Sequence, residues 1–177
     1  MKQHITLRGM IYASMLGALT ALGAYLTIPL NPIPLTLQTL FVFLAGALIG
    51  GPQAAMSQIV YIVLGLIGLP VFAGGKAGLG TLLGPTGGYL FGFVISAFIM
   101  GFIVDLKKNT EIIWMIFAML IGLVVIYSLG VLQLSFVANM PIQKAILLGA
   151  APFILGDIAK LFAAAIIASK VRDKIKR

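Results

Sequence analysis

Six long apolar segments, separated by short breaks rich in glycine, proline or charge, form the main pattern of this 177-residue chain. Apolar segments of about 20 residues have the length of a helix that crosses a bilayer, so the pattern predicts membrane-spanning helices. The second and third segments are nearer 15 residues, and we expect them to be tilted or buried against neighbours. The predicted helices cover residues 9–28, 36–49, 54–68, 88–104, 112–134 and 142–169.

Composition agrees with this pattern. Hydrophobic residues make up 61% of the chain and charged residues 9%, with a mean hydropathy of +1.15. No charge occurs between Arg8 and Lys76 or between Glu111 and Lys144. These values lie far from those of soluble domains. They predict an all-α integral membrane protein whose six transmembrane helices form one domain, residues 1–177.

The distribution of basic residues predicts the orientation. Six spans place both termini on one side of the membrane. Nine of the twelve basic residues fall on that side, and only Lys76 and Lys144 fall on the other. The remaining one, Lys160, lies inside a span. This asymmetry follows the positive-inside rule. It predicts a multi-pass protein of the cell membrane with both termini cytoplasmic, and it argues against nucleic-acid binding despite the net charge of +8. The nine are Lys2, Arg8, Lys107, Lys108, Lys170, Arg172, Lys174, Lys176 and Arg177.

Asp157 and Lys160 form a charged pair in an otherwise uncharged stretch, residues 145–169. An ionised side chain at the centre of a membrane helix costs about 2.5–3.5 kcal/mol. Spacing of three places both side chains on one helical face. One interpretation is an internal ion pair that neutralises itself. The other, which we favour, is a polar anchor in a ligand cavity, because ionisable residues inside membranes mark functional sites.

Residues 69–87 contain so many glycines and prolines that a regular helix is excluded. The segment also carries apolar residues such as Phe72, Leu79 and Leu82, so we do not expect it to extend freely into water. Irregular backbone at membrane depth is stable where it is buried in protein or lines a cavity. We therefore predict an outward-facing lid over the helices, with open backbone N–H groups. The alternative is a plain linker.

Catalytic chemistry has few candidates. Gly75-Lys76 fails the nucleotide-binding loop pattern twice, because Pro70 and Ala77 stand where Gly and Ser or Thr are needed. The chain has no cysteine, one histidine and four acidic residues, of which only Asp157 lies inside an apolar segment. One carboxylate makes neither an acid–base pair nor a metal cage. We predict a protein that is not an enzyme and has no metal site and no cofactor.

The first segment carries small residues at four-residue steps: Ala13, Gly17 and Ala21, with Ser14 and Ala18 beside them. Small residues at this spacing let another helix approach closely. On periodicity alone, packing against this protein's own bundle is the favoured use.

Four motifs carry a resemblance to a known family. They are Pro32-Ile33-Pro34-Leu35-Thr36-Leu37-Gln38-Thr39, Gly68-Leu69-Pro70-Val71-Phe72-Ala73-Gly74-Gly75, Gly84-Pro85-Thr86-Gly87-Gly88-Tyr89 and Gly156-Asp157-Ile158-Ala159-Lys160. In this order and spacing, from about Thr6 to Lys170, the chain resembles the BioY family, the biotin-specific substrate-binding (S) components of energy-coupling factor (ECF) transporters.

The resemblance implies a six-helix S-component fold that binds biotin with high affinity near the outer face for vitamin uptake. It also implies partners, a transmembrane coupling subunit and two cytoplasmic ATPase subunits that supply ATP hydrolysis. In that family the small residues of the first helix dock on the coupling subunit. Ala13, Gly17 and Ala21 are then the expected partner contact, which reverses the preference for internal packing.

The resemblance also suggests how biotin is held. Asp157 would accept from the ureido N–H groups and Lys160 would donate to an anionic or carbonyl oxygen. Phe72 and Tyr89 would line an apolar pocket, with Gln38 and Tyr89 as polar liners. Lys76 and the Gly74 and Gly75 backbone would belong to the lid, over the carboxylate, although other family members can have asparagine at the Lys76 position. A solitary facilitator that uses Asp157 as a proton site, an S component for another vitamin and an intramembrane enzyme are the competing hypotheses.

Overall fold

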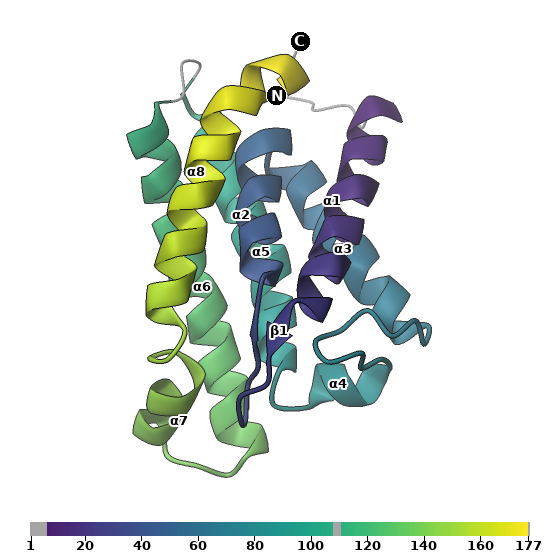
Figure 1. Ribbon diagram of the computed structural model, residues 1–177, viewed down its shortest axis with the longest axis vertical. Helices are drawn as coiled ribbons and strands as arrows, with labels where there is room; N and C mark the ends of the chain where they lie inside the picture. Colours follow the sequence, from purple (N-terminus) through teal and green to yellow (C-terminus); the bar gives the residue numbers. More distant parts are fainter. Residues whose placement is uncertain (1–6, 108–110, 177) are drawn as a thin grey trace.

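The computed structural model describes residues 7–107 and 111–176, with only the backbone of Lys176; Lys2, Lys108 and Arg177 of the predicted basic side lie outside this part. It contains helices and one short two-stranded sheet (Figure 1). The elements are α1 (Leu7–Tyr25), β1 (Thr27–Ile28), β2 (Leu35–Thr36), α2 (Gln38–Ile49), α3 (Gly51–Leu66), α4 (Leu79–Leu83), α5 (Gly87–Asp105), α6 (Ile112–Val137), α7 (Ile142–Gly149) and α8 (Ile154–Lys176).

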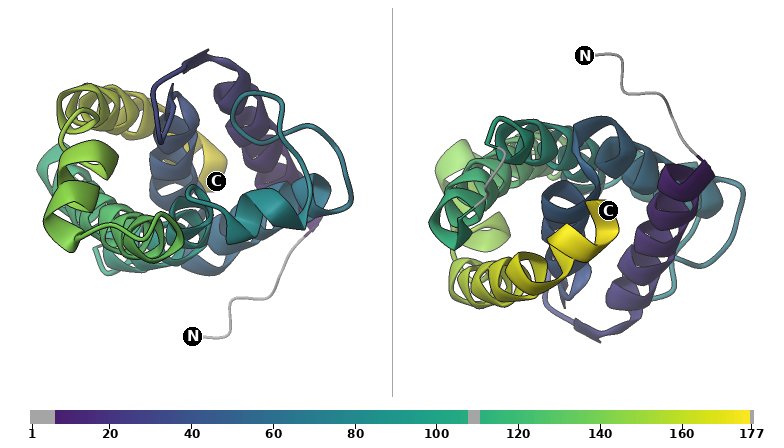
Figure 2. Two further views of the ribbon diagram at one scale, coloured as in Figure 1. Left: turned by 90° about the horizontal axis from the view of Figure 1, so that it is seen from below. Right: turned by 90° about the horizontal axis from the view of Figure 1, so that it is seen from above.

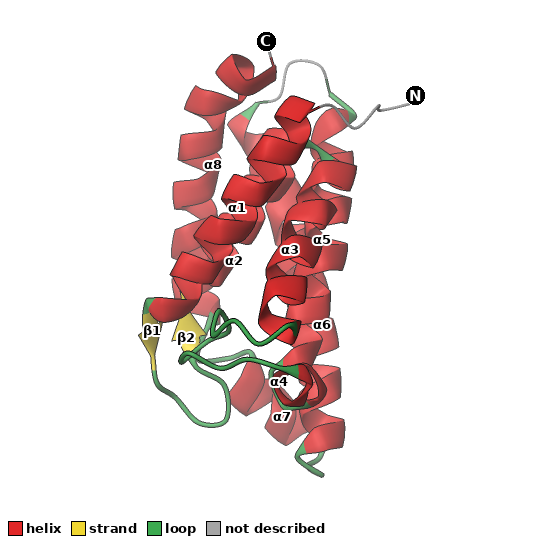
Figure 3. Ribbon diagram, turned by 90° about the vertical axis from the view of Figure 1, so that its right-hand side faces the viewer, coloured by secondary structure: helices red, strands yellow, loops and turns green. Residues whose placement is uncertain are grey.

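The long helices form one bundle. α1 begins and α8 ends at the same end of it, whereas the two strands, α4 and α7 gather at the opposite end (Figures 1 and 3). Along the bundle axis, α2 lies centrally and contacts α1, α5 and α8 (Figure 2). The apolar face of α2 is therefore covered by protein, and 10 of its 12 residues are buried.

Glycines allow the bundle to pack backbone against backbone. A Cβ added to Gly101 of α5 would lie 2.3 Å from the Gly51 nitrogen, so α5 and the α2–α3 corner are in direct main-chain contact. Met100 fills the space left by two further glycines: a Cβ on Gly46 or on Gly122 would lie 2.8 or 2.3 Å from its side chain. Small residues thus determine which helices can approach one another.

The first helix is shorter than predicted. α1 ends at Tyr25, and Thr27 and Ile28 pair with Thr36 and Leu35 in an antiparallel ladder. The prediction of a helix to residue 28 is wrong here. The reason is local: Pro29 disfavours helical backbone at Ile28, and Thr27 and Ile28 are β-branched residues that suit a strand.

The sixth predicted helix is broken. α7 and α8 are separated by residues 150–153 and bend by 52°. The prediction of one continuous helix over 142–169 is therefore wrong. Pro152 lies in the break, has no N–H to donate and disfavours a helical conformation in the preceding residue. After the break a new helix begins at Ile154, six residues before Lys160, and Asp157 therefore lies in its first turn.

Within the described residues, three helices are long and apolar enough to cross a membrane: α1, α5 and α6. The bent pair α7 and α8 counts as a fourth span if taken together. α2 and α3, with 12 and 16 residues, are shorter. The apolar multi-pass architecture is therefore evident, and the count of six spans stays a prediction.

Candidate functional site

A pocket opens at the end of the bundle where the strands and the lid segment, residues 69–87, come together. It holds about 690 Å³ of space, open solvent at its mouth included. Its walls come from β2, α2, α5, α6, α8 and the lid segment. Six of the eight binding residues expected from the sequence line it: Gln38, Phe72, Lys76, Tyr89, Asp157 and Lys160.

Gly74 and Gly75 do not line this pocket. Both have φ near +73°, a conformation that glycine adopts readily, and they form the tip of a tight turn. The turn is closed by the Phe72 N–H, which donates to the Lys76 carbonyl at 2.9 Å, and by the Gly75 N–H, which donates to the Phe72 carbonyl at 3.0 Å. The N–H of Gly75 is therefore not open for a ligand, in contrast to the expectation. The two glycines shape the turn that carries Lys76.

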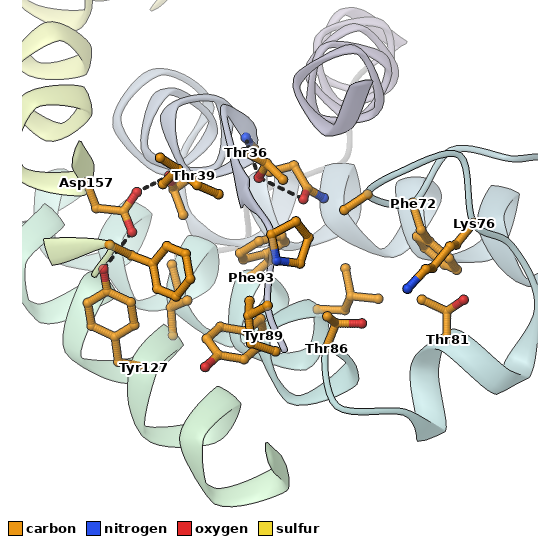
Figure 4. A pocket seen from close by; sticks show the side chains of 18 of the residues that line it. Thr36, Thr39, Phe72, Lys76, Thr81, Thr86, Tyr89, Phe93, Tyr127 and Asp157 are labelled. Atoms are coloured by element: carbon orange, nitrogen blue, oxygen red, sulfur yellow. Dashed lines mark hydrogen bonds between the residues drawn. The ribbon is translucent and has the colours of Figure 1, made fainter. Parts of the chain in front are cut away.

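Asp157 is 3% exposed and accepts three hydrogen bonds. Its Oδ1 atom accepts from Thr39 Oγ1 at 2.7 Å and its Oδ2 atom accepts from the Tyr127 hydroxyl at 2.7 Å (Figure 4). Oδ1 also accepts from Lys160 Nζ at 2.7 Å. The carboxylate also lies in the first turn of α8, where the helix dipole favours negative charge. A carboxylate has about four acceptor positions. Oδ2 therefore keeps acceptor capacity toward the pocket.

Lys160 makes an ion pair with Asp157 and donates to the Thr36 carbonyl at 2.6 Å. Its third close contact, with Thr39 Oγ1, is longer at 3.3 Å. The two charges therefore neutralise each other, and both residues also line the pocket. That the pair anchors a ligand stays a prediction. The long contact with Thr39 is the one that an acceptor on a ligand would most easily replace.

Gln38 and Tyr89 contribute to the wall, but their polar groups have protein partners. The Tyr89 hydroxyl donates to the Gly149 carbonyl at 2.7 Å. The ring of Tyr89, and not its hydroxyl, is therefore the part available to a ligand in the pocket. The Gln38 side chain accepts from Thr36 Oγ1 at 2.9 Å and donates to the Tyr61 hydroxyl at 2.6 Å. These bonds fix the orientation of both side chains.

Lys76 lies at the other side of the pocket from Asp157, next to Thr81 and Phe72 (Figure 4). It is exposed, and its ammonium group has no hydrogen bond or ion pair with any other residue in the described ranges. The pocket is thus polarised. One side has a buried, hydrogen-bonded acid–base pair, and the other has a cation that is free to meet an anionic group.

Hydrogen bonds from several helices attach the lid segment to the bundle. The Tyr25 hydroxyl of α1 donates to the Pro70 carbonyl, and Gln133 of α6 donates to the carbonyls of Leu82 and Gly84 at 2.9 and 2.8 Å. Between these attachments, the Gly78 N–H donates to the Gly65 carbonyl of α3 at 2.8 Å. The segment is therefore packed over the bundle and contains the short helix α4.

Several wall residues were missed from the sequence. Thr39 and Tyr127 are the neutral partners of Asp157, and Phe93, Ile126 and Phe153 supply apolar surface. A signal existed for Tyr127, a polar aromatic residue inside the apolar segment 112–134, and for Thr39, which follows Thr36 and Gln38 in a polar group. The apolar residues carried no such signal.

Two of the small residues of α1, Ala13 and Gly17, point inward. Ala13 is 2% exposed, and a Cβ on Gly17 would lie 2.7 Å from the Ser57 carbonyl oxygen of α3. In this structure Ala13 and Gly17 therefore pack inside the bundle, the use that periodicity alone favours, and a partner contact through them stays a prediction. Ala21 is half-buried, and the exposed small residues of this helix are Ser14 and Ala18.

Comparisons with known proteins agree with this geometry. The sequence profile of the BioY family matches residues 1–177. The biotin transporter BioY of Thermotoga maritima is 42% identical over 166 residues, 94% of this chain and 96% of that protein, and the one of Rhodobacter capsulatus is 37% identical over 182 residues, covering 97% and 94%. A crystal structure of the S-component for biotin from an ECF-type ABC transporter superposes with a TM-score of 0.88 at 29% identity, covering 98% of this chain and 95% of that one. The chain therefore belongs to the BioY family.

Proposed function

We propose that this protein is the biotin-binding S component of an ECF-type uptake transporter. The observation that carries the proposal is the polarised pocket, with the Asp157–Lys160 pair on one side and the unpaired Lys76 on the other. Biotin has the matching polarity, because it joins a ureido ring to an aliphatic tail that ends in a carboxylate. The names of the relatives and of the superposed structure support the same ligand.

The ureido ring fits the Asp157 side. A ureido N–H would donate to Oδ2 of Asp157, which already accepts from Tyr127 only. The ureido carbonyl would accept from Lys160 in place of the 3.3 Å contact with Thr39. Hydrogen bonds to charged groups in a dry pocket are the stronger kind, so this side would supply specificity.

The tail fits the other side. Phe72, Phe93 and Phe153 offer apolar surface for the ring sulfur and the methylene groups, and Lys76 is placed for the carboxylate. Lys76 belongs to the lid, so a ligand carboxylate would hold the lid over the occupied pocket.

Charge and topology support an orientation and a set of partners. Of the described basic residues, Arg8, Lys107, Lys170, Arg172 and Lys174 lie toward the helix ends opposite the pocket, whereas Lys76, Lys144 and Lys160 do not. By the positive-inside rule this end is cytoplasmic, so the pocket faces outward. The chain carries no nucleotide-binding loop, so two ATPase subunits and a transmembrane coupling subunit would supply the energy. The outward small residues of α1, Ser14 and Ala18, are a suitable contact for that coupling subunit.

Delivery of biotin inward requires that the two orientations of the subunit differ in affinity for ligand and partner. We propose that the subunit binds biotin at the outer face, tilts in the bilayer when the ATPases act through the coupling subunit, and releases the ligand inside.

Equilibrium dialysis of the purified protein with labelled biotin tests the proposal. We expect saturable binding of one biotin per chain, displaced by unlabelled biotin and unaffected by thiamine or riboflavin. No saturable binding would overturn the proposal, and displacement by another vitamin would reassign the ligand. If uptake in cells stopped on addition of an uncoupler but persisted after ATP depletion, the protein would be a solitary facilitator instead.

A further inference from the structure

Tyr61 of α3 lies behind the pocket wall and touches two of the residues that form it. It is 0% exposed and does not line the pocket itself. Its ring packs edge-on against the ring of Phe72, with centroids 5.6 Å apart and planes at 87°, and its hydroxyl accepts from Gln38 Nε2 at 2.6 Å. Phe72 belongs to the lid and Gln38 to α2, so one buried side chain supports two separate parts of the wall.

On the lid side, Phe72 is seated on α3. It is 1% exposed, and a Cβ on Gly65 would lie 2.1 Å from its ring, so the absence of a side chain at Gly65 makes room for it. Phe72 also donates its N–H to the Lys76 carbonyl. The position of the Phe72 ring therefore determines where the turn places Lys76.

On the polar side, the contacts continue from Gln38 to the charged pair. Gln38 Oε1 accepts from Thr36 Oγ1 at 2.9 Å, and the Thr36 carbonyl accepts from Lys160 Nζ at 2.6 Å. Lys160 is paired with Asp157. A contiguous series of contacts thus joins the lid to the side of the pocket farthest from Lys76.

We infer that Tyr61 is a positioning residue that couples the lid to the charged side of the pocket. Its ring packs against Phe72 and its hydroxyl accepts a hydrogen bond from Gln38, so Phe72 and Gln38 must take up their positions together. The inference rests on the proposed function, because it concerns how one ligand engages both sides. A ligand that orders Lys160 and Thr36 stabilises Gln38 and Tyr61, and through Tyr61 it stabilises the closed lid.

Tyr61→Phe separates the two contacts, because it keeps the ring beside Phe72 and removes the oxygen that accepts from Gln38. Tyr12→Phe is the matched control, since Tyr12 lies on α1 and its hydroxyl contacts only Arg8 among the described side chains. The first readout is the dissociation constant for biotin by equilibrium dialysis. We expect about a fivefold to tenfold rise for Tyr61→Phe, as for the loss of one hydrogen bond, and no change for Tyr12→Phe.

The second readout reports coupling independently of affinity. No lysine or arginine lies between Arg8 and Lys76, so trypsin cleavage in the lid releases a fragment that ends at Lys76. At saturating biotin, we expect cleavage of the wild type to slow at least tenfold, and that of Tyr61→Phe to slow clearly less. If Tyr61 had a purely structural role, Tyr61→Phe would lower the melting temperature, but the ratio of cleavage rates without and with biotin would equal that of the wild type.

Gly65→Ala tests the same coupling from the lid side, because the added methyl group displaces the Phe72 ring and leaves the Tyr61–Gln38 bond. Gly65→Ala should also reduce the protection that biotin gives against trypsin cleavage after Lys76. It serves as the test variant if Tyr61→Phe does not fold. Protection equal to the wild type in the folded variant would overturn the inference while leaving the proposed function intact. A wild-type protein that binds no biotin would overturn the proposed function itself.

Discussion

Asp157 and Lys160 are three residues apart on α8, and their Oδ1 and Nζ atoms lie 2.7 Å apart in the wall of the pocket. Three further groups bind this pair from other parts of the chain: Thr36 on β2, Thr39 on α2 and Tyr127 on α6. The pair therefore joins these three elements to α8 and also lines the pocket. Removing one partner of a buried pair costs about 3–5 kcal/mol, because the other charge is left uncompensated.

The variant Asp157→Asn should bind biotin about 10- to 100-fold more weakly, because hydrogen bonds to a charged group contribute about 1.5–3 kcal/mol. Isothermal titration of the purified protein measures this. Asp105→Asn is the control, since Asp105 pairs with Arg172 away from the pocket, and it should leave the affinity unchanged. An Asp157→Asn protein with wild-type affinity would show that Asp157 does not anchor the ligand.

Tyr127→Phe should weaken biotin binding in the wild-type background, because the carboxylate loses the hydroxyl that orients it. In the Asp157→Asn background the same substitution should have almost no effect, since groups that act on one ligand through a shared contact are not additive. The dissociation constants for biotin of the wild type, the two single variants and the double variant complete this double-mutant cycle. Additive losses would mean that Tyr127 acts independently of Asp157.

Lys76→Met should lower the affinity for biotin roughly tenfold and leave the affinity for biotin methyl ester unchanged, because the ester has no carboxylate to pair with. Lys144→Met is the matched control: Lys144 is an exposed lysine on α7 that does not line the pocket. Competition dialysis with both ligands gives the comparison. An equal loss for acid and ester would assign Lys76 a role in the shape of the lid rather than in charge recognition.

Ala18→Leu should prevent co-purification with a coexpressed ECF coupling module and spare biotin binding, because Ala18 is exposed on the outer face of α1. Gly17→Leu should behave differently. Its side chain would meet the Ser57 carbonyl of α3, so the protein itself should lose thermal stability. Normal assembly of the Ala18→Leu protein would exclude this face as the contact.

Gly101→Ala should lower the melting temperature strongly, because its methyl group would lie 2.3 Å from the backbone nitrogen of Gly51. Neither backbone can move without separating α5 from the α2–α3 corner. Gly80→Ala provides the control, since a Cβ there meets nothing within 4 Å and its φ is not in the left-handed region. Thermal unfolding followed by circular dichroism in detergent distinguishes the two variants.

The class of the protein and the charged residues of the pocket were predictable from the sequence. A chain with 61% hydrophobic residues and almost no charge inside long segments has few alternatives to a helical membrane bundle, because lipid cannot satisfy open backbone groups. Asp157, Lys160 and Lys76 were identified because charge among apolar residues is conspicuous. Pro152, which is visible in the sequence, breaks the last predicted helix.

Other features depended on tertiary contacts. Periodicity placed Ala13 and Gly17 on one face of α1, but only the position of α3 showed that this face is covered. Thr39 and Asp157, 118 residues apart, meet only because α2 packs against α8. Sequence by itself determined the class of the protein and where its charges lie along the chain, since both are local properties. The tertiary structure alone decided which neighbours satisfy those charges, because such contacts join residues that no local pattern relates.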